Sequence, residues 1–547
     1  MSRTPLFRYL VRAARLARAS QASGASSAET VERWRESVQF SRRSFLATAG
    51  AATVGLAAGC GKISQLTGRG DGKKGDRPVL IIGGGIAGLT CAYRLQQQNV
   101  PVRVIEGQKR VGGRMFSLTN YFPENQVCEL GGELVDSGHE HLRGLCQELG
   151  LTLDDFDTDD PKLSDDLWYF DGVRRKDEDV VEAFKPIAEK MAKSWEEVNG
   201  DSFDYQNPNG AERVDNLSIA QWLDEAECDG WFRKLLEVGY LTEYGREVSE
   251  QSAWNMLYLI DYETPDPFRI FGDSDERYHI RGGNDQVPKL LAGKLGERVE
   301  TNSRLESISR APDGSYRCSV RRDATSETIS ADRVVLALPF TMLREVKMDV
   351  ELPAVKKKAI AELGYGTNAK LMVGFSERVW RTGSVASNGS ILTDLPFQLT
   401  WESTRLQPGK GGILVCYTGG ERGVAMGEGT PAEQAEKFVA ELEKVYPGVA
   451  ERRTGETRMH WPTFPWMKAS YACYLPGQWT TISTAEGERV DKLHFCGEHT
   501  SVDFQGYMEG GCESGTRVAD EILVDLGLKK PEKEEKEAPE ETEKKAA

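Results

Sequence analysis

The chain has 547 residues, of which 39% are hydrophobic, and a formal net charge of −16 at pH 7. At this length we expect a large buried core divided over roughly three to four domains. The acidic balance argues against nucleic acid as a partner, and the lack of an apolar run near 20 residues argues against a protein with several membrane spans.

The first 60 residues have the features of an export signal. Arg42 and Arg43 come before about 14 weakly apolar residues that end at Cys60, a stretch too short to span a bilayer. The pattern resembles a Tat signal, which a receptor reads, and predicts a periplasmic or extracellular protein. The alternative is an ordinary helix start that happens to contain two arginines. LAAGC at the end of the stretch is similar to a lipoprotein box, which leaves membrane anchoring through a lipidated Cys60 open.

A dinucleotide-binding motif follows the leader. The stretch VLIIGGGIAG, residues 79–88, predicts a buried strand, a glycine turn and the start of a helix. Gly83 allows the turn, Gly85 lets the backbone approach a pyrophosphate, and Gly88 lets the helix pack on the strand. A second apolar strand ends at Glu106, whose carboxylate can accept hydrogen bonds from a ribose. These features predict a bound dinucleotide, either NAD or FAD.

Three separated motifs narrow the prediction. After Glu106 the chain continues GQKRVGGRMFSL. Counted from Glu106, these residues match the pattern E-x-x-x-R-x-G-G-R, whose last arginine is Arg114. ELGGELVD, residues 129–136, and HFCGEHTSVDFQGYMEGGCESGTRVA, residues 494–519, are two further matches. Together they resemble the flavin amine oxidase family, which includes monoamine oxidases, polyamine oxidases and L-amino acid oxidases. The resemblance implies FAD rather than NAD as the cofactor.

The resemblance also implies which residues hold FAD. Arg114 is expected at the pyrophosphate and Glu498 at the ribityl chain. A helix starting near Met508 is expected to direct its positive end at the flavin, and Gly510 and Gly511 suit a helix start that a ligand approaches closely. The residues expected in the FAD site are Gly83, Gly85, Ile86, Ala87, Gly88, Glu106, Gly113, Arg114, Gly131, Gly132, Glu133, Leu305, Glu498 and Met508.

The expected fold class is α/β. An FAD-binding Rossmann-like domain of the glutathione-reductase type is expected to be interleaved with a mixed α+β substrate domain and a helical insertion. The expected boundaries are 1–60 for the signal, 61–76 for a linker, 77–149, 276–345 and 485–527 for the FAD-binding domain, 150–275 for the helical substrate-entrance domain, 346–484 for the substrate-binding domain, and 528–547 for a charged, disordered tail.

Three residues are expected to act on the substrate. The amine must be neutral, with its Cα–H facing flavin N5 in a dry and partly aromatic cleft, and this chemistry needs no metal. The resemblance implies that Lys370 holds a water at N5 and that Tyr471 and Tyr507 flank the amine. From the residues alone, Lys370 could instead face solvent at a sheet edge and the tyrosines could only pack. Trp461 and Trp466 are expected to pack behind the site.

The ten cysteines are scattered without C-x-x-C spacing, so neither a metal site nor a disulfide framework is expected. Free and mostly buried thiols are the default interpretation. In the monoamine oxidases a cysteine just before the first of the two tyrosines binds flavin covalently. Here that residue is Ser470, and Cys473 lies three residues too late, so the resemblance implies non-covalent FAD.

The expected reaction is oxidative deamination by hydride transfer from Cα–H to flavin N5. The resulting imine is hydrolysed to a keto acid or aldehyde plus ammonia, and molecular oxygen becomes hydrogen peroxide. L-Amino acids are the expected substrates, because the Tat signal and ELGGELVDSGH together resemble secreted bacterial oxidases that act on them.

Four alternatives stay open. Leu134 stands where several L-amino acid oxidases carry an arginine, and a carboxylate needs such a cation, so a monoamine or a polyamine remains possible as substrate. A carotenoid-desaturase-like or protoporphyrinogen-oxidase-like flavoprotein and a non-catalytic FAD-binding lipoprotein are the other readings. The oligomeric state stays open as well, with a homodimer as one possibility.

Overall fold

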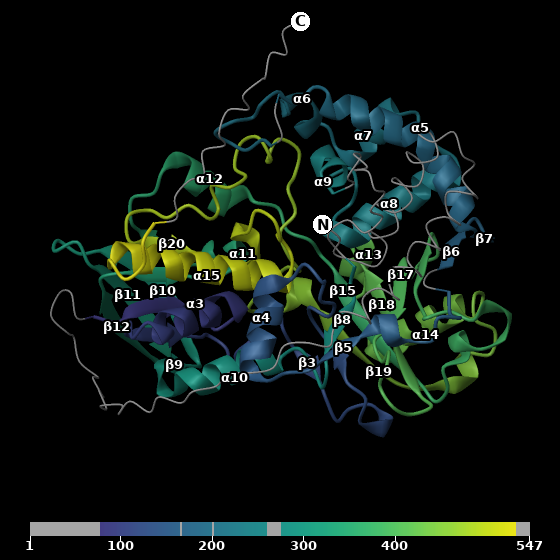
Figure 1. Ribbon diagram of the computed structural model, residues 1–547, viewed down its shortest axis with the longest axis horizontal. Helices are drawn as coiled ribbons and strands as arrows, with labels where there is room; N and C mark the ends of the chain where they lie inside the picture. The colour runs from purple at the N-terminus through teal and green to yellow at the C-terminus, as the bar shows by residue number, and fades with distance from the viewer. Residues whose placement is uncertain (1–76, 165–166, 200–201, 260–274, 532–547) are drawn as a thin grey trace, which may run out of the picture.

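The computed structural model describes residues 77–164, 167–199, 202–259 and 275–531. The expected signal with Cys60, the linker and the tail from residue 532 lie outside the described residues. Figure 1 shows a parallel sheet with its helices on one side of the molecule, and a second sheet covered by a group of helices on the other side.

The first side is built on a five-stranded parallel sheet of order β20-β13-β1-β2-β9. Its strands are short apolar runs that come from three distant segments of the chain, as expected for an interleaved domain. They are β1 (Val79–Ile82), β2 (Val102–Ile105), β9 (Val299–Glu300), β13 (Val334–Leu336) and β20 (Leu493–Phe495). Every residue of β1 is buried, because both faces of the sheet are covered.

Successive residues of β1 enter different cores. Ile81 packs on the helix side, whereas Leu80 and Ile82 pack on the side of a four-stranded sheet. The helices are α3 (Ile86–Gln97), α4 (Glu140–Leu149), α10 (Gln286–Leu295) and α15 (Met508–Asp525), and the four-stranded sheet has the order β12 (Thr325–Ala331), β11 (Tyr316–Arg322), β10 (Ser303–Arg310) and β14 (Lys347–Asp349). These layers confirm the predicted Rossmann-like architecture.

The two ends of the described chain meet where α15 packs on α3, seen in Figure 1 as yellow beside purple. A Cβ at Gly515 would lie 2.3 Å from the carbonyl oxygen of Ala87, and one at Gly511 would lie 2.7 Å from the Ile86 side chain. A Cβ at Gly510 would meet the carbonyl oxygen of Phe504 at 2.1 Å. Gly511 and Gly515 therefore allow α15 to pack closely on α3, and Gly510 allows it to pack on the loop before it. The sequence had suggested that Gly510 and Gly511 let a ligand approach the helix start.

The second side is built on a seven-stranded sheet. Its strands in spatial order are β19 (Arg453–His460), β15 (Ala369–Phe375), β18 (Gly412–Thr418), β17 (Leu399–Glu402), β16 (Ile391–Thr393), β6 (Leu167–Phe170) and β7 (Val173–Arg175). β15 lies between two neighbours and is buried along its length. Leu371 and Val373 pack toward α14 (Pro431–Leu442), so the alternation of the strand turns Lys370 and Met372 to the opposite face.

Helices cover that opposite face. They are α5 (Asp177–Trp195), α6 (Glu212–Asp215), α7 (Ile219–Glu225), α8 (Gly230–Tyr244) and α9 (Ala253–Leu257). The segment expected as a helical insertion thus also contains strands, since β6 and β7 join the seven-stranded sheet. Smaller elements complete the described fold: β3 (Ser117–Leu118) pairs with β4 (Cys128–Glu129), β5 (Leu153–Asp155) pairs with β8 (Tyr278–Ile280), and α11 (Phe340–Leu343), α12 (Ala354–Glu362) and α13 (Gly420–Ala425) are short helices.

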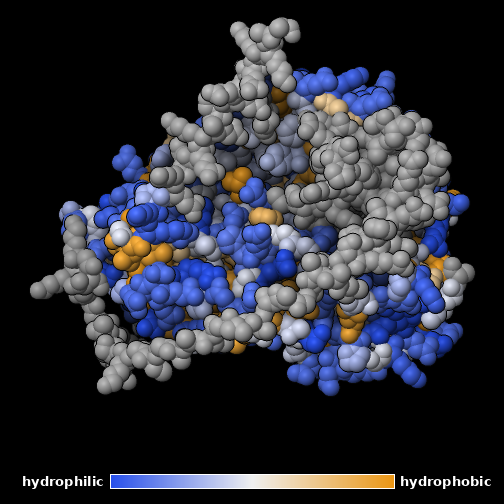
Figure 2. All heavy atoms as spheres, viewed as in Figure 1, coloured by the Kyte–Doolittle hydropathy of each residue, from blue (hydrophilic) through white to orange (hydrophobic). Residues whose placement is uncertain are grey.

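The described surface in Figure 2 is largely hydrophilic, with apolar residues in small separated groups. The large hydrophobic residues that are exposed come from many different elements, as with Tyr121, Leu290 and Val424. None of the described helices is both long enough and apolar enough to cross a membrane.

Candidate active site

One cavity reaches from the glycine turn after β1 to strands β15, β17 and β18 of the other sheet. Its empty volume is about 1820 Å³ with the open end included. The residues expected to bind FAD line it, with the exception of Gly88, and so do Lys370, Tyr471 and Tyr507.

The glycine turn forms the first end of the cavity, called here the nucleotide end. Gly83 has a φ of +116°, and a Cβ there would lie 2.4 Å from the carbonyl oxygen of Ala337. Around Gly85 a Cβ would meet no protein atom within 4 Å, so the backbone lies open to a ligand. Gly88 is different, because a Cβ would lie 2.1 Å from the carbonyl oxygen of Gly83. Gly88 does not line the cavity and serves the packing of α3 on the turn, the packing role that the motif predicts for it. Its place in the FAD site stays a prediction.

Glu106 ties this end together at the tip of β2. Its two carboxylate oxygens accept hydrogen bonds from the backbone N–H groups of Gly84 and Gln108, both at 2.7 Å. Burial raises the pKa of Glu106, although these two hydrogen bonds oppose the shift. The carboxylate therefore orients the glycine turn and still lies on the cavity wall.

Arg114 and Glu498 meet on the cavity wall. Arg114 Nη1 donates to Glu498 Oε1 at 2.7 Å and to the Ser470 carbonyl oxygen at 2.8 Å. The other oxygen of Glu498 accepts from the Gly506 N–H at 2.8 Å. The structure thus brings together two residues that the sequence separates by 384 positions, and their roles toward pyrophosphate and ribityl groups stay predictions.

His499, beside Glu498, places two ring nitrogens in the buried part of the cavity wall. Its ring is 1% exposed and lines the cavity, and neither ring nitrogen has a hydrogen-bond partner among the described residues. Burial lowers the pKa of His499 to about 3, so the ring is neutral. A buried ring with unused polar atoms and the open backbone at Gly85 both fit a polar, phosphate-bearing cofactor such as FAD.

Lys370 lies at the other end of the cavity, called here the substrate end. It is 5% exposed, and β15 is an interior strand, so the alternative of a solvent-facing lysine is wrong. Its Nζ donates to Glu133 Oε2 at 2.8 Å, to the Gly131 carbonyl oxygen at 2.7 Å and to the Glu129 carbonyl oxygen at 3.2 Å. All three donors of the ammonium are therefore used by the protein, an arrangement that the sequence did not reveal.

Lys370 belongs to a group of four buried ionisable residues. Glu129 accepts hydrogen bonds from Ser117 and from the Asn284 N–H, and its Oε1 lies 3.0 Å from His279 Nε2. Burial acts against the charge on His279, but pairing with Glu129 outweighs it and raises the pKa of His279. Burial likewise acts against the charge on Glu133, but attraction to Lys370 prevails and lowers the pKa of Glu133.

Aromatic side chains enclose the substrate end. Tyr471 lies on the cavity wall with its hydroxyl 2.7 Å from that of Tyr417 and donating to the Glu243 carbonyl oxygen at 2.8 Å. Lys370 Nζ lies 5.1 Å from the ring centre of Trp401. Tyr417 and Trp401 were not predicted. They come from strands β18 and β17. β18 pairs with β15 and β17 pairs with β18, and only this order of strands brings the two side chains to the site.

Two other tryptophans differ from their expected place. Trp461 and Trp466, predicted to pack behind the site, both line the cavity. Trp461 Nε1 donates to the Leu130 carbonyl oxygen at 3.1 Å. A Cβ at Gly107 would lie 2.2 Å from the Trp466 ring, so this ring lies directly against the loop after β2.

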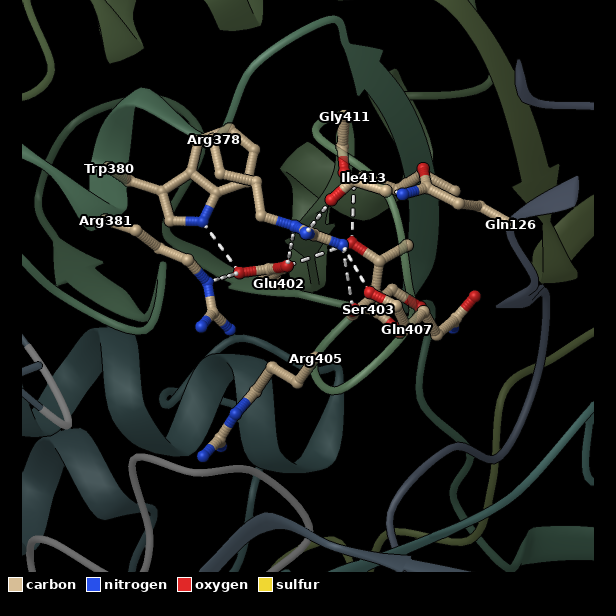
Figure 3. A network of polar contacts seen from close by, with 12 residues as sticks. Gln126, Arg378, Trp380, Arg381, Glu402, Ser403, Arg405, Gln407, Gly411 and Ile413 are labelled. Atoms are coloured by element: carbon tan, nitrogen blue, oxygen red, sulfur yellow. Dashed lines mark hydrogen bonds and ion pairs between the residues drawn. The ribbon is translucent and has the colours of Figure 1, made fainter. Parts of the chain in front are cut away.

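A polar network surrounds Glu402 on the far side of β17 from Trp401. Glu402 follows Trp401 and is buried, with Arg378 Nε at 2.7 Å and Arg381 Nε at 2.6 Å from its two oxygens. Figure 3 shows both guanidinium groups and the Trp380 ring nitrogen directed at this carboxylate. A buried carboxylate with several charged and neutral donors is held in one position, so the β17 backbone at this point of the cavity wall is anchored from behind.

The described cavity wall includes no cysteine, which agrees with the expected non-covalent FAD. Ser470 lines the cavity, whereas Cys473 is buried beside Asn255. The nine cysteines of the described residues are all free and buried, as expected.

Similar proteins place this geometry in a known context. An L-amino acid dehydrogenase of Synechocystis sp. is 24% identical over 467 residues, which cover 81% of this chain and 94% of that protein. An L-amino-acid oxidase of Siganus canaliculatus is 25% identical over 465 residues, covering 81% and 85%. The structure of cyclohexylamine oxidase from Brevibacterium oxydans has a TM-score of 0.72 at 24% identity and covers 83% of this chain and 100% of its own, which confirms the fold.

The family described as "Flavin containing amine oxidoreductase" matches residues 86–523. That range contains the Arg114 motif, Lys370 and the start of α15, and thus most of the cavity wall. The chain therefore belongs to the flavin-containing amine oxidoreductases, FAD-dependent enzymes that oxidise CH–NH₂ donors.

Proposed function

We propose that this protein is an oxidase that deaminates a small-molecule amine and passes the electrons to molecular oxygen. The observation that supports it is one continuous cavity with an open glycine turn at the nucleotide end and Lys370, Tyr471 and Tyr507 at the substrate end. When bound, FAD accepts the hydride from the substrate carbon and is reoxidised by oxygen with release of hydrogen peroxide.

The residues of this chain prepare the substrate end for that reaction. The rings of Trp401, Tyr417 and Trp461 line it and exclude water, which favours the neutral form of an amine. Tyr417 and the Glu243 carbonyl oxygen orient the hydroxyl of Tyr471, so the ring of Tyr471 has one position on the wall. Lys370 places a positive charge at the same end. Its three donors are used by the Glu129 and Gly131 carbonyl oxygens and by Glu133, so a water there would have to displace one of these contacts.

L-Amino acids are the first substrate class that we propose, because two relatives carry that substrate in their names. Amines without a carboxylate are the second class, and one observation favours them. The arginines on the described cavity wall are already paired, Arg114 with Glu498 at 2.7 Å and Arg304 with Glu345 at 2.9 Å. A carboxylate at the substrate end would therefore rely on another cation.

The decisive experiment is an absorbance spectrum of the purified protein combined with hydrogen peroxide release across a panel of L-amino acids, monoamines and polyamines. We expect a flavin spectrum that bleaches anaerobically with at least one amine and recovers with oxygen. A flavoprotein that releases no peroxide with any member of the panel would contradict the proposal and favour the desaturase-like or non-catalytic alternatives.

We also propose Tat export to the periplasm or the extracellular space, supported by the paired Arg42 and Arg43 before a weakly apolar stretch. The double variant Arg42→Lys/Arg43→Lys should leave folded, FAD-loaded protein in the cytoplasm, because the receptor reads the two guanidinium groups. Unchanged export of this variant would exclude the Tat pathway. Labelling with palmitate tests lipidation, for which Cys60→Ala is the matched control.

A further inference from the structure

The four buried ionisable residues at the substrate end carry charges of opposite sign. Glu129 and Glu133 carry negative charges, Lys370 carries a positive charge, and His279 adds a second one when it is protonated. None of the four is more than 8% exposed. Because burial weakens screening by water, any change in this balance acts directly on a charged group that enters the cavity.

The partners of the two carboxylates differ. Glu129 is engaged by His279, Ser117 and the Asn284 N–H, and it does not contact Lys370 through its carboxylate. The carboxylate of Glu133 accepts directly from Lys370 Nζ at 2.8 Å. Glu133 and Lys370 both line the cavity, whereas Glu129 and His279 lie behind it. Glu133 is thus the group that neutralises the ammonium on the wall.

We propose that Glu133 is a specificity-determining residue that sets how strongly the cavity discriminates against a substrate carboxylate. This inference deepens the proposed function and rests on it. With Glu133 ionised, the ammonium of Lys370 is compensated, and a substrate carboxylate meets a wall of no net charge. Without the Glu133 carboxylate, Lys370 would be an uncompensated cation at the substrate end and would attract the carboxylate of an amino acid.

The opposite view is that the pair only stabilises the fold. A purely structural pair would, when broken, weaken stability and alter the turnover of all substrates alike. A specificity-determining pair changes the ratio between two substrates that differ only by a carboxylate. The ratio of their kcat/KM values is therefore the readout that separates the two views.

The test compares L-phenylalanine with 2-phenylethylamine, which has the same side chain and lacks the carboxylate. In Glu133→Gln we expect kcat/KM for the amino acid, relative to the amine, to rise about 10-fold or more, mainly through a lower KM. Glu133→Asp keeps the charge and should stay close to the parent ratio. In Glu133→Gln/Lys370→Gln the gain should vanish, because the cation that causes it is gone.

A binding experiment removes the dependence on turnover. Benzoate and benzylamine are titrated into the FAD-loaded variants, and binding is read from the flavin absorbance. Benzoate should bind Glu133→Gln about 10-fold more tightly than the parent, relative to benzylamine. Should Glu133→Gln not retain FAD, Lys370→Gln gives the reverse test, since the uncompensated Glu133 should weaken benzoate binding relative to benzylamine.

These results separate the two proposals. A substrate ratio and a benzoate affinity that stay within about threefold of the parent in Glu133→Gln would overturn the role of Glu133, even if amines are oxidised. A gain that persists without Lys370 would overturn it as well. If no amine is oxidised but benzoate affinity changes as expected, the charge balance holds and the proposed oxidase activity fails.

Discussion

The nucleotide end and the substrate end of the cavity are built by different means. At the nucleotide end the glycine turn offers backbone, and its key positions are those where a side chain is missing, as at Gly83 and Gly85. At the substrate end, side chains from distant strands meet, and a buried ion pair between Lys370 and Glu133 lies on the wall. The first end should therefore be sensitive to added atoms and the second to lost charges.

The largest effect is expected from a lost charge. Lys370→Met should slow flavin reduction or reoxidation about 100-fold or more, because a positioned charged group is removed from the reacting end. It should also cost about 3–5 kcal/mol of the free energy of unfolding, since Glu133 remains buried without its partner. Anaerobic stopped-flow spectroscopy and urea unfolding measure the two losses separately.

The matched control for this variant is Lys370→Met/Glu133→Gln. It removes both charges, so stability should recover by most of the loss whereas the slow rates remain. Suppose that Lys370→Met alone keeps its stability, and that flavin reduction and reoxidation stay within about threefold of the parent. The ion pair then has no role at the substrate end, and the expectation that this end is sensitive to lost charges is wrong.

The next effect comes from an added atom at the nucleotide end. Gly88→Ala places a methyl group only 2.1 Å from the Gly83 carbonyl oxygen and should destabilise the protein by about 1–3 kcal/mol. The sign of the change in unfolding free energy is informative, because replacing glycine by alanine inside a helix normally stabilises a protein by about 1 kcal/mol. Thermal unfolding of the FAD-free protein is the measurement.

Gly85→Ala is the control at the same turn. Its Cβ would meet no protein atom within 4 Å, so the FAD-free protein should keep its stability. We expect FAD affinity to fall about 10-fold or more, because the methyl group occupies space that a phosphate needs. Equal stability losses in the two variants would show that Gly85 has a packing role as well.

A smaller effect depends on pH. Pairing with Glu129 raises the pKa of His279 against the effect of burial. A raised pKa means that the stabilisation is complete below the unfolded value of about 6.5 and is lost as pH rises through the folded value. The melting temperature of the parent relative to His279→Gln should therefore decline above about pH 6.5. A difference that stays constant up to pH 9 would show that His279 is neutral throughout.

The same contrast explains what could be predicted from the sequence. The residues of the glycine turn, Arg114 and Glu498 were predicted because each lies in a motif whose spacing is local. Gly88 was predicted to pack the helix on the strand and was also counted among the FAD contacts. Only the structure shows that it does not line the cavity. Trp401 and Tyr417 were missed, since they reach the site only because β18 pairs with β15 and β17 pairs with β18.

Charge pairing was equally hidden. Glu133 was predicted as a cofactor contact and Lys370 as a holder of water, and each residue fits its own motif. Their contact joins positions 237 residues apart, and it depends on how the turn after β4 packs against β15. No local pattern in either motif contains that information, although an acidic residue directly after two glycines in a buried segment was a signal that a cation lay opposite.

The smallest expected effect concerns the aromatic wall, where the Tyr471 hydroxyl has a contact to Tyr417 and another to Glu243. The hydroxyl of Tyr471 contacts that of Tyr417 at 2.7 Å and the Glu243 carbonyl oxygen at 2.8 Å. Tyr417→Phe removes only the first contact, so activity should stay within about threefold of the parent. Tyr471→Phe removes both contacts and should raise KM more than Tyr417→Phe does. Because the two hydroxyls act as a pair, the double variant should be no worse than Tyr471→Phe alone. An additive loss in steady-state kinetics would show that Tyr417 acts on the substrate independently of Tyr471.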